Sequence, residues 1–204
     1  MVELVYGTRN RAKLASMTQI LEGLRITLLG LDGWDDLPEV EENGATPLEN
    51  ARLKAQAYGR ALGRPVFSCD SGLYFDGVAE EDQPGVHVRM VGGRRLSDEE
   101  MVAHYSGLAA RYGGLTARYH NAICLALPDG RLVESMDDSL SDQPFRLVAQ
   151  PHPKRVPGFP LDCLSVHLGT GLYYYDRKAH QADDIAWRKE FRFFFQQALP
   201  LLGE

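Results

Sequence analysis

Apolar positions in the first thirty residues alternate between strand spacing and helix spacing. The runs Leu4–Tyr6 and Ile26–Leu29 predict two strands, and apolar residues at helical spacing between them predict a helix that begins near Asn10. The apolar residues of this helix are Leu14, Met17, Ile20, Leu21 and Leu24. The chain is therefore expected to open as a strand, a helix packed on a sheet and a second strand.

A capping pattern predicts a second helix. Thr46 is followed by Pro47 at the first helical position and by Glu49 three residues after the cap, so Glu49 is expected to cap this helix rather than to bind a ligand. The inward positions are Ala51, Ala55, Tyr58 and Leu62. After this helix the chain is predicted to enter a short strand over Val66–Ser68 and then an Asp-Ser-Gly turn.

The middle of the chain combines one helix with a hairpin. Ser97–Glu100 repeats the capping pattern and predicts a helix to about Leu108. Strand-like runs over Thr116–Leu127 and Arg131–Met136, joined by a Pro-Asp-Gly turn, predict a β-hairpin.

The last third is less regular. Gln143–Pro160 contains 5 of the 11 prolines and predicts an irregular loop region, and Asp183–Leu202 predicts a helix whose aromatic residues pack in a core or between subunits. Alternating strands and helices followed by a hairpin-rich half predict an α/β fold with a mixed central β-sheet flanked by helices. Its 204 residues, 44% of them hydrophobic, suit a single domain over residues 1–204.

Composition narrows the class of ligand and the compartment. A net charge of −6 argues against a general nucleic-acid binder, so an anionic ligand should be small and held by a few placed cations. Cys69, Cys124 and Cys163 are odd in number and widely separated, which favours a reducing cytoplasm. No apolar run is long enough for a signal peptide or a membrane helix, so no membrane partner is expected.

The segment Leu4–Leu14 has the form of an anion site. A strand runs through a polar turn into a basic helix, so Thr8, Asn10 and Lys13 are placed to surround a phosphate at the helix start. The spacing is not that of a Walker A loop, and the alternative is an ordinary turn with a solvated lysine.

Two further segments add carboxylates. Val40–Lys54 carries the pair Glu41 and Glu42 just before a helix, and Asp70 follows an apolar strand. A phosphate site together with a carboxylate site indicates metal-assisted phosphate chemistry, for which Mg²⁺ takes oxygen ligands.

The three segments together resemble the inosine triphosphate pyrophosphatase family, also called Ham1-like. Its motifs Thr/Ser-x-Asn-x-x-Lys, Glu-Glu-x-Gly-x-Thr-x-x-Glu-Asn-Ala and Asp-Ser-Gly-Leu all occur in order. The resemblance implies a two-lobed Ham1/Maf-like architecture and Mg²⁺-dependent hydrolysis of non-standard purine nucleoside triphosphates, of the inosine or xanthosine type, to monophosphate and diphosphate. It also implies a cytoplasmic homodimer.

The resemblance implies roles for individual residues. Asp70 becomes the general base and a metal contact, and Glu41 is the closest match to the metal-binding glutamate, with Glu42 as the alternative. An extended backbone points neighbouring side chains to opposite faces, so only one of the two glutamates should enter the site. Lys54 and Ser71 become phosphate contacts, although on sequence alone Lys54 is equally well explained as a solvated helix lysine.

The base-recognition half of the family pattern is altered here. Phe159 and Asp162 stand where the family has Phe-Gly-Tyr-Asp, and they can stack on a base and accept a hydrogen bond. Arg188 matches the family's arginine, whereas Trp187 replaces its histidine and Ala182 stands at its lysine position.

These replacements leave the preferred base open. Lys178 or His180 is a speculative substitute for the missing lysine, and Cys69 stands where the family often has another aspartate. Two alternatives to the leading hypothesis are a Maf-like pyrophosphatase acting on other nucleotides and a nucleotide-binding regulatory protein without turnover.

Overall fold

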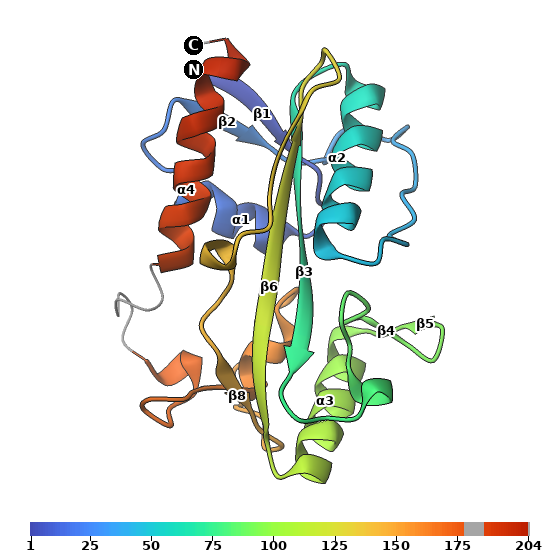
Figure 1. Cartoon of the computed structure of the whole chain (residues 1–204), viewed down its shortest axis with the longest axis vertical. Helices are drawn as coiled ribbons and strands as arrows, with labels where there is room; N and C mark the ends of the chain where they lie inside the picture. The colour runs from blue at the N-terminus through green and yellow to red at the C-terminus, as the bar shows by residue number, and fades with distance from the viewer. Residues whose placement is uncertain (178–185, 204) are drawn as a thin grey trace. The chain divides into compact units, whose positions relative to one another are not determined.

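The computed structural model describes residues 1–177 and 186–203, and the chain divides into two compact units (Figure 1). The first unit consists of Met1–Ser71, Asn121–Leu140 and Ala186–Glu204. The second unit consists of Gly72–His120 and Ser141–Ile185. The long strands β3 (Val66–Phe75) and β6 (Leu115–Ala126) contribute residues to both.

The sheet is mixed and flanked by helices, which confirms the predicted fold class. Its strand order is β2-β1-β3-β6-β8-β9, with β7 paired to β6. The bounds of these strands are β1 (Val2–Tyr6), β2 (Ile26–Leu29), β7 (Leu132–Ser135), β8 (Phe145–Leu147) and β9 (Ser165–His167). β1 pairs in parallel with β2 and β3, whereas β6 pairs antiparallel with β7 and β8. Among the described residues no helix is both long and apolar enough to cross a membrane.

The first unit is a sheet covered by helices on both faces. Its other strands are β1 (Val2–Tyr6), β2 (Ile26–Leu29) and β7 (Leu132–Ser135), and its α-helices are α1 (Arg11–Ile20), α2 (Pro47–Leu62) and α4 (Ala186–Ala198). Two 3₁₀ turns complete it, η2 (Asp138–Leu140) and η6 (Leu199–Leu202).

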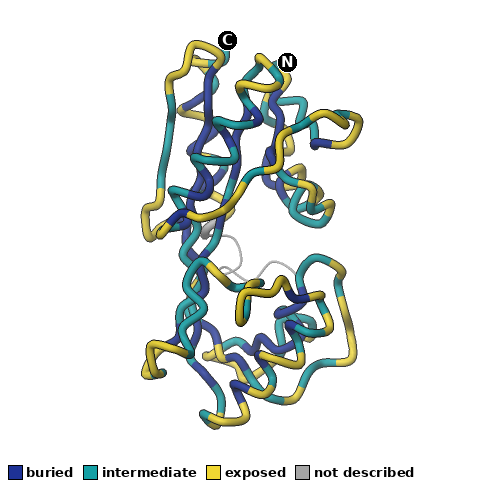
Figure 2. Tube along the Cα trace, turned by 90° about the vertical axis from the view of Figure 1, so that its right-hand side faces the viewer, coloured by how far each residue is buried: buried dark blue, intermediate teal, exposed yellow. Residues whose placement is uncertain are grey.

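Figure 2 colours the chain trace by burial and marks the buried residues in dark blue. The alternation of side chains along the strands builds two apolar layers in this unit. One face packs against α1 and α4, and its buried residues include Leu4, Tyr6, Phe67, Ile123 and Phe195. The other face packs against α2, and its buried residues include Val5, Val66, Tyr58, Ala51 and Ala55. The strands are therefore apolar on both sides, as strands of a covered sheet are.

Helix α2 is fixed at both ends and along its length. The Thr46 side chain accepts from the Glu49 amide at 3.2 Å, and Gly63 ends the helix in the left-handed conformation at φ 61°. Arg52 makes two hydrogen bonds of 2.6 and 2.9 Å to Glu134 of β7, which ties the helix to the hairpin.

The second unit has one helical layer. Its further elements are β4 (Met90–Val91), β5 (Arg94–Arg95), β8 (Phe145–Leu147), β9 (Ser165–His167), α3 (Asp98–Tyr112), η1 (Glu80–Asp82), η3 (Pro160–Leu164) and η4 (Tyr174–Asp176). The core forms between the sheet, α3 and η3 around Phe75, Tyr105, Leu115 and Phe145. The predicted capping box is confirmed, because Ser97 accepts from the Glu100 amide and Glu100 accepts from that of Ser97.

Helix α3 continues to Tyr112 rather than to about Leu108, and α1 ends at Ile20, before Leu21 and Leu24. Three further predicted boundaries are wrong. Strand β3 continues to Phe75, so Asp70, Ser71 and Gly72 lie within a strand rather than in a turn. Gly72 serves close packing instead of an unusual dihedral, because a Cβ there would lie 2.7 Å from Tyr74 Cε2. The pairing of β3 with β6 supplies the hydrogen bonds that carry the strand through this polar stretch.

The other two errors concern short segments. Strand β8 interrupts the proline-rich region expected to be irregular, because Phe145 and Leu147 both point into the core. Helix α4 ends at Ala198 rather than at Leu202, since Pro200 lacks the N–H needed to continue the α ladder. The predicted start at Asp183 lies outside the described residues.

Candidate active site in the first unit

The turn from β1 into α1 is held by its own side chains. Thr8 accepts from the Asn10 amide at 3.2 Å, and the Asn10 side chain accepts from the amides of Ala12 and Lys13 at 2.9 and 3.2 Å. Asn10 is therefore the N-cap of α1. The amides of Asn10, Ala12 and Lys13 are thus bonded within the turn, so the charge that it offers to an anion comes from side chains such as Lys13.

The Lys13 ammonium faces the other charged groups of this unit. Burial and the positive charge of Lys54 lower the pKa of Lys13, and together they outweigh the attraction of Asp70, Cys69 and Glu42. The shift places the ammonium of Lys13 within electrostatic range of Lys54 and of the carboxylates. A half-buried lysine beside another cation is a position that an anionic ligand would stabilise.

The loop before α2 presents the glutamate pair. Within it, the Gly44 amide donates to Asn50 Oδ1 at 2.8 Å and the Ala45 amide donates to Glu49 Oε2 at 2.7 Å. Asn50 is only 1% exposed, and a Cβ on Gly44 would lie 2.6 Å from Glu49 Cβ. Asn50 and Glu49 thus hold the loop closely against the start of α2, and the capping role predicted for Glu49 is confirmed.

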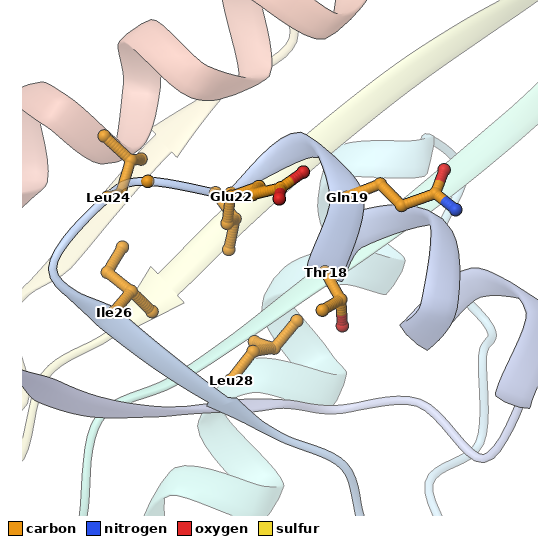
Figure 3. A pocket seen from close by; sticks show the side chains of 8 residues that line it. Thr18, Gln19, Glu22, Leu24, Ile26 and Leu28 are labelled. Carbon is orange, nitrogen blue, oxygen red and sulfur yellow. The ribbon is translucent and has the colours of Figure 1, made fainter.

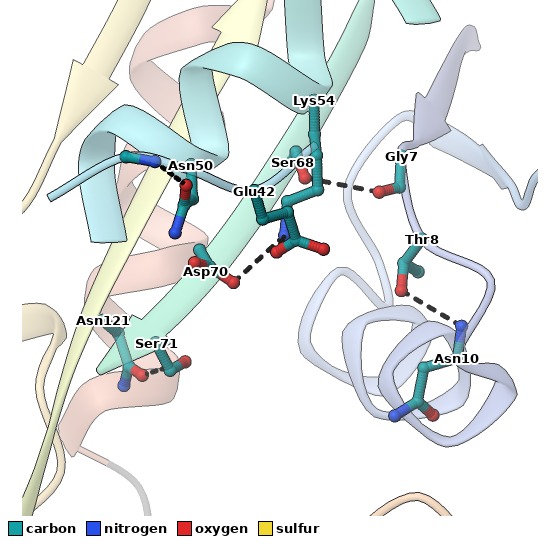
Figure 4. Close-up of polar contacts among 11 residues, drawn as sticks. Gly7, Thr8, Asn10, Glu42, Asn50, Lys54, Ser68, Asp70, Ser71 and Asn121 are labelled. Atoms are coloured by element: carbon teal, nitrogen blue, oxygen red, sulfur yellow. Dashed lines mark hydrogen bonds and ion pairs between the residues drawn. The ribbon is translucent and has the colours of Figure 1, made fainter. Parts of the chain in front are cut away.

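One of the two glutamates meets Asp70 through a lysine (Figure 4). Lys54 Nζ lies 2.8 Å from Glu42 Oε2 and 3.0 Å from Asp70 Oδ1. Both glutamates are exposed, and Glu42, whose side chain is 43% exposed, is the one that pairs with Lys54. The side chains of Lys54 and Asp70 are 12% and 11% exposed, so this ion pair is poorly screened by water.

The electrostatics of Lys54 reflect its partners. Burial alone would lower the pKa of Lys54, but the charges of Asp70 and Glu42 and their hydrogen bonds raise it. Lys54 is therefore a charged group with two carboxylate partners rather than the solvated helix lysine that the sequence also allowed.

Ser71 is oriented by a neighbouring strand. Its hydroxyl donates to Asn121 Oδ1 of β6 at 2.7 Å, and Asn121 Nδ2 donates to the Leu140 carbonyl at 2.9 Å. Because the Ser71 proton is used in this bond, its oxygen lone pairs remain as acceptors. In this geometry Ser71 suits a water or a metal-bound ligand better than a phosphate oxygen.

Cys69 faces the other side of β3. It packs against the apolar layer beneath α1 and α4, and burial raises its pKa to about 12. A thiol with so high a pKa is not a nucleophile at neutral pH, and Cys69 is a half-buried residue within β3.

The donors at this site fit Mg²⁺. Asp70 and Glu42 already share one cation, and within the described ranges no cluster of three or more His, Cys, Asp or Glu residues is placed to hold a metal. Two carboxylates completed by waters and substrate phosphates are a donor set that Mg²⁺ takes in proteins. The residues present would thus hold the ion together with a phosphorylated ligand.

A separate hollow in this unit does not suit an anion (Figure 3). It has a volume of about 390 Å³ between the end of α1 and β2. Its described lining includes Leu24, Ile26 and Leu28 together with Glu22, and it contains no lysine or arginine. An apolar hollow with one carboxylate offers nothing to a triphosphate.

The remaining predicted residues lie elsewhere. Phe159 and Asp162 belong to the second unit, where Asp162 lies on η3, and Arg188 is exposed on α4 in the first unit. The Trp187 side chain, together with Lys178, His180 and Ala182, lies outside what the structure describes.

Asp162 lies in a poorly solvated part of the second unit. Burial raises its pKa from 3.8 to about 6. The nearby Tyr119 and Tyr175 are also affected, since burial and then the charge of Asp162 raise the pKa of both hydroxyls. Asp162 is the acidic group of this unit best suited to exchange a hydrogen bond with a polar ligand.

We expect Asp162→Asn to stabilise the protein at neutral pH. The pKa of Asp162 is higher in the folded protein than in the unfolded chain. Ionisation of this group therefore lowers the free energy of unfolding as pH rises from about 4 to about 6, and the loss persists at higher pH. Removing the charge should recover up to about 3 kcal/mol, which means a rise of several degrees in Tm at pH 7.5 and little change at pH 4. Thermal melts at both pH values measure this, with exposed Asp36→Asn as control; an equal shift at both would contradict it.

Sequence reasoning missed two positioning residues, Asn50 and Asn121. Asn50 anchors the loop that carries Glu42, and it was not among the site residues predicted from the sequence. The sequence did contain a signal for this role, because Asn50 lies early in a capped helix that follows a glycine-containing loop, where its side chain can bond the loop backbone. Asn121 had no local signal, because its contact with Ser71 joins positions fifty residues apart.

The fold and the site define an α/β protein in which two lysines and two carboxylates converge near the start of α1 and within β3. Residues 4–140 match the model of the Ham1 family. The dITP/XTP pyrophosphatase of Streptomyces avermitilis is 38% identical over 212 residues, covering 100% of both chains. That of Geobacter sulfurreducens is 43% identical over 99 residues, 48% of this chain and 49% of its own length.

A solved structure agrees with the fold. The Ham1 protein from Coxiella burnetii superposes with a TM-score of 0.71 at 21% identity, covering 100% of both chains. The chain belongs to the Ham1 family, which confirms the resemblance found in its motifs.

Proposed function

We propose that this protein is a Mg²⁺-dependent nucleoside triphosphate pyrophosphatase that converts non-standard purine nucleotides of the inosine or xanthosine type to monophosphate and diphosphate. The observation that carries the proposal is the buried ion pair of Asp70 with Lys54, joined by Glu42. These three residues lie within the part of the chain that matches the family, and the relatives named above are dITP/XTP pyrophosphatases.

The reaction replaces one bond to the α-phosphorus by another. The oxygen of a water bonds to phosphorus, the bond from phosphorus to the bridging oxygen breaks, and diphosphate leaves with the bond's electron pair. Asp70 takes the proton of that water as general base. Lys13 and Lys54 meet the negative charge of the phosphates, and Thr8, Asn10 and Ser71 line the approach to them.

Bound Mg²⁺ would neutralise phosphate charge and orient the triphosphate. Glu42 and Asp70 would hold it, with Glu41 on the exposed side of the same loop. Asp70 is therefore assigned two roles. Phe159, Asp162 and Arg188 are the residues proposed to stack on the base and to bond its polar edge.

A panel of nucleoside triphosphates with Mg²⁺, assayed for released diphosphate, tests the proposal. We expect kcat/KM to be greatest for inosine and xanthosine triphosphates, with no turnover in the presence of a chelator. Preference for a pyrimidine or modified nucleotide would support the Maf-like alternative, and binding without diphosphate release would support a regulatory protein. Membership of the Ham1 family argues against the first of these alternatives.

We expect base discrimination to depend on Trp187. Indole offers one donor and no acceptor, so a site built around it should reject adenosine triphosphate less strongly than one built around histidine. Trp187→His should raise the ratio of kcat/KM for inosine over adenosine triphosphate by roughly tenfold. A lower Tm with an unmoved ratio would place Trp187 in packing instead, and a strong inosine preference in the unmodified protein would oppose the prediction.

We also propose a cytoplasmic homodimer acting without nucleic-acid or membrane partners. Phe193 on α4 and Leu201 in η6 are 55% and 42% exposed, and exposed apolar side chains of this size favour contact with another subunit. The three cysteines are unpaired, which suits a reducing compartment.

A further inference from the structure

The Lys54 ammonium occupies the place of a counter-cation. It is bound by oxygens of Glu42 and Asp70 at 2.8 and 3.0 Å, and the side chains of Lys54 and Asp70 are 12% and 11% exposed. Water therefore contributes little to neutralising Asp70, and the chain supplies the positive charge itself. No second amine shares these two contacts among the ion pairs of the described residues.

The same two carboxylates are the ligands proposed for the divalent cation, and Lys54 contacts one oxygen of each, Oε2 of Glu42 and Oδ1 of Asp70. A bound Mg²⁺ lies about 2.0–2.1 Å from its ligand oxygens, closer than an ammonium can approach. Two cations bound to the same pair of carboxylates repel each other, and the repulsion is strong where water has little access to screen it. Lys54 and the divalent cation therefore compete for Glu42 and Asp70.

We propose that Lys54 exchanges with the divalent cation: it holds Glu42 and Asp70 together until the cation binds, then releases both carboxylates and directs its ammonium to the triphosphate. The direction of release rests on the proposed function, whereas the exchange itself requires no nucleotide. The flexible four-carbon stem of lysine suits a group that changes partner. Lys13 is a second cation close enough to interact with Lys54, so an anion bound between them would contact both.

One consequence is coupling between the two ligands. The cation alone must displace Lys54 from both carboxylates, so it binds weakly. A triphosphate attracts the displaced ammonium and so removes that competition. Each ligand therefore raises the affinity of the protein for the other by more than the direct contact between the two ligands would.

Direct titration with Mn²⁺ in the absence of nucleotide tests the exchange. We expect Lys54→Met to bind Mn²⁺ roughly tenfold more tightly than the unmodified protein, because the competing cation is gone. The exposed Lys189→Met on α4 should leave the affinity unchanged. Equal or weaker binding by Lys54→Met would overturn the exchange and assign Lys54 to fixing the carboxylates, and Asp70→Asn added to Lys54→Met should abolish the gain.

A second measurement uses the unmodified protein, so it does not depend on the variant folding. Lysine acylation followed by mass spectrometry reports the accessibility of each amine. Adding Mg²⁺ or Mn²⁺ should raise labelling of Lys54 severalfold relative to Lys189. Unchanged or reduced labelling at saturating cation would overturn the exchange.

The two hypotheses fail separately. If the cation releases Lys54 but the nucleotide panel yields no diphosphate, the proposed function fails and the exchange stands. If diphosphate is released while Lys54 labelling does not rise, the exchange fails and the proposed function stands.

Discussion

Asp70→Asn should lower kcat by roughly 10²-fold or more while leaving the fold intact. The amide removes both the proton acceptor and one negative charge, yet it keeps the shape of the side chain and can still accept the hydrogen bond from Lys54 that now measures 3.0 Å. Steady-state kinetics with the preferred triphosphate measure the loss, and circular dichroism with a thermal melt measures the fold.

The matched control for this change is Asp76→Asn, an exposed aspartate just beyond the end of β3. It should retain normal turnover, since it lies outside the cluster. Near-normal kcat in Asp70→Asn would remove Asp70 from the chemistry. A large fall in Tm accompanying the loss would instead assign Asp70 to stability.

Lys13→Ala should weaken triphosphate binding by roughly 10- to 100-fold, since a hydrogen bond to a charged group contributes about 1.5–3 kcal/mol. It should also raise Tm slightly, because the lowered pKa of Lys13 means that burial and the charge of Lys54 make its ammonium costly to the folded protein. Opposite effects on binding and stability are the signature of a residue kept for its ligand.

Arg11→Ala provides the comparison for Lys13→Ala. Arg11 is the first residue of the same helix, but its side chain is 86% exposed and pairs with Asp32. We expect it to change neither KM nor Tm appreciably. Equal weakening by both variants would indicate a general effect of net charge, and an unchanged KM in Lys13→Ala would remove Lys13 from the site.

Local patterns predicted the elements that depend on neighbouring residues. The caps at Thr46 and Ser97 have their acceptors and donors within a few residues, and both helices begin where the pattern places them. The motif around Asp70 predicted its chemistry but not its conformation. A strand through Asp-Ser-Gly requires a partner strand distant in sequence, and no local pattern contains that information.

The glutamate pair shows the same limit. Alternation in an extended backbone predicted that one of Glu41 and Glu42 would enter the site, but not which. The choice depends on how Asn50 anchors the loop, which brings Glu42 to Lys54. The family motif does not distinguish these two adjacent glutamates, and tertiary contacts determine which of them enters the site.

The placement of α4 has a consequence for synthesis on the ribosome. Phe191, Phe194 and Phe195 complete an apolar layer whose other members include Leu4 and Tyr6, which are synthesised long before them. The nascent first unit must therefore keep the part of this apolar face that α4 covers exposed until α4 has emerged. Such a face is a binding surface for chaperones, and a ribosome that stalls before residue 191 leaves a product that cannot bury it.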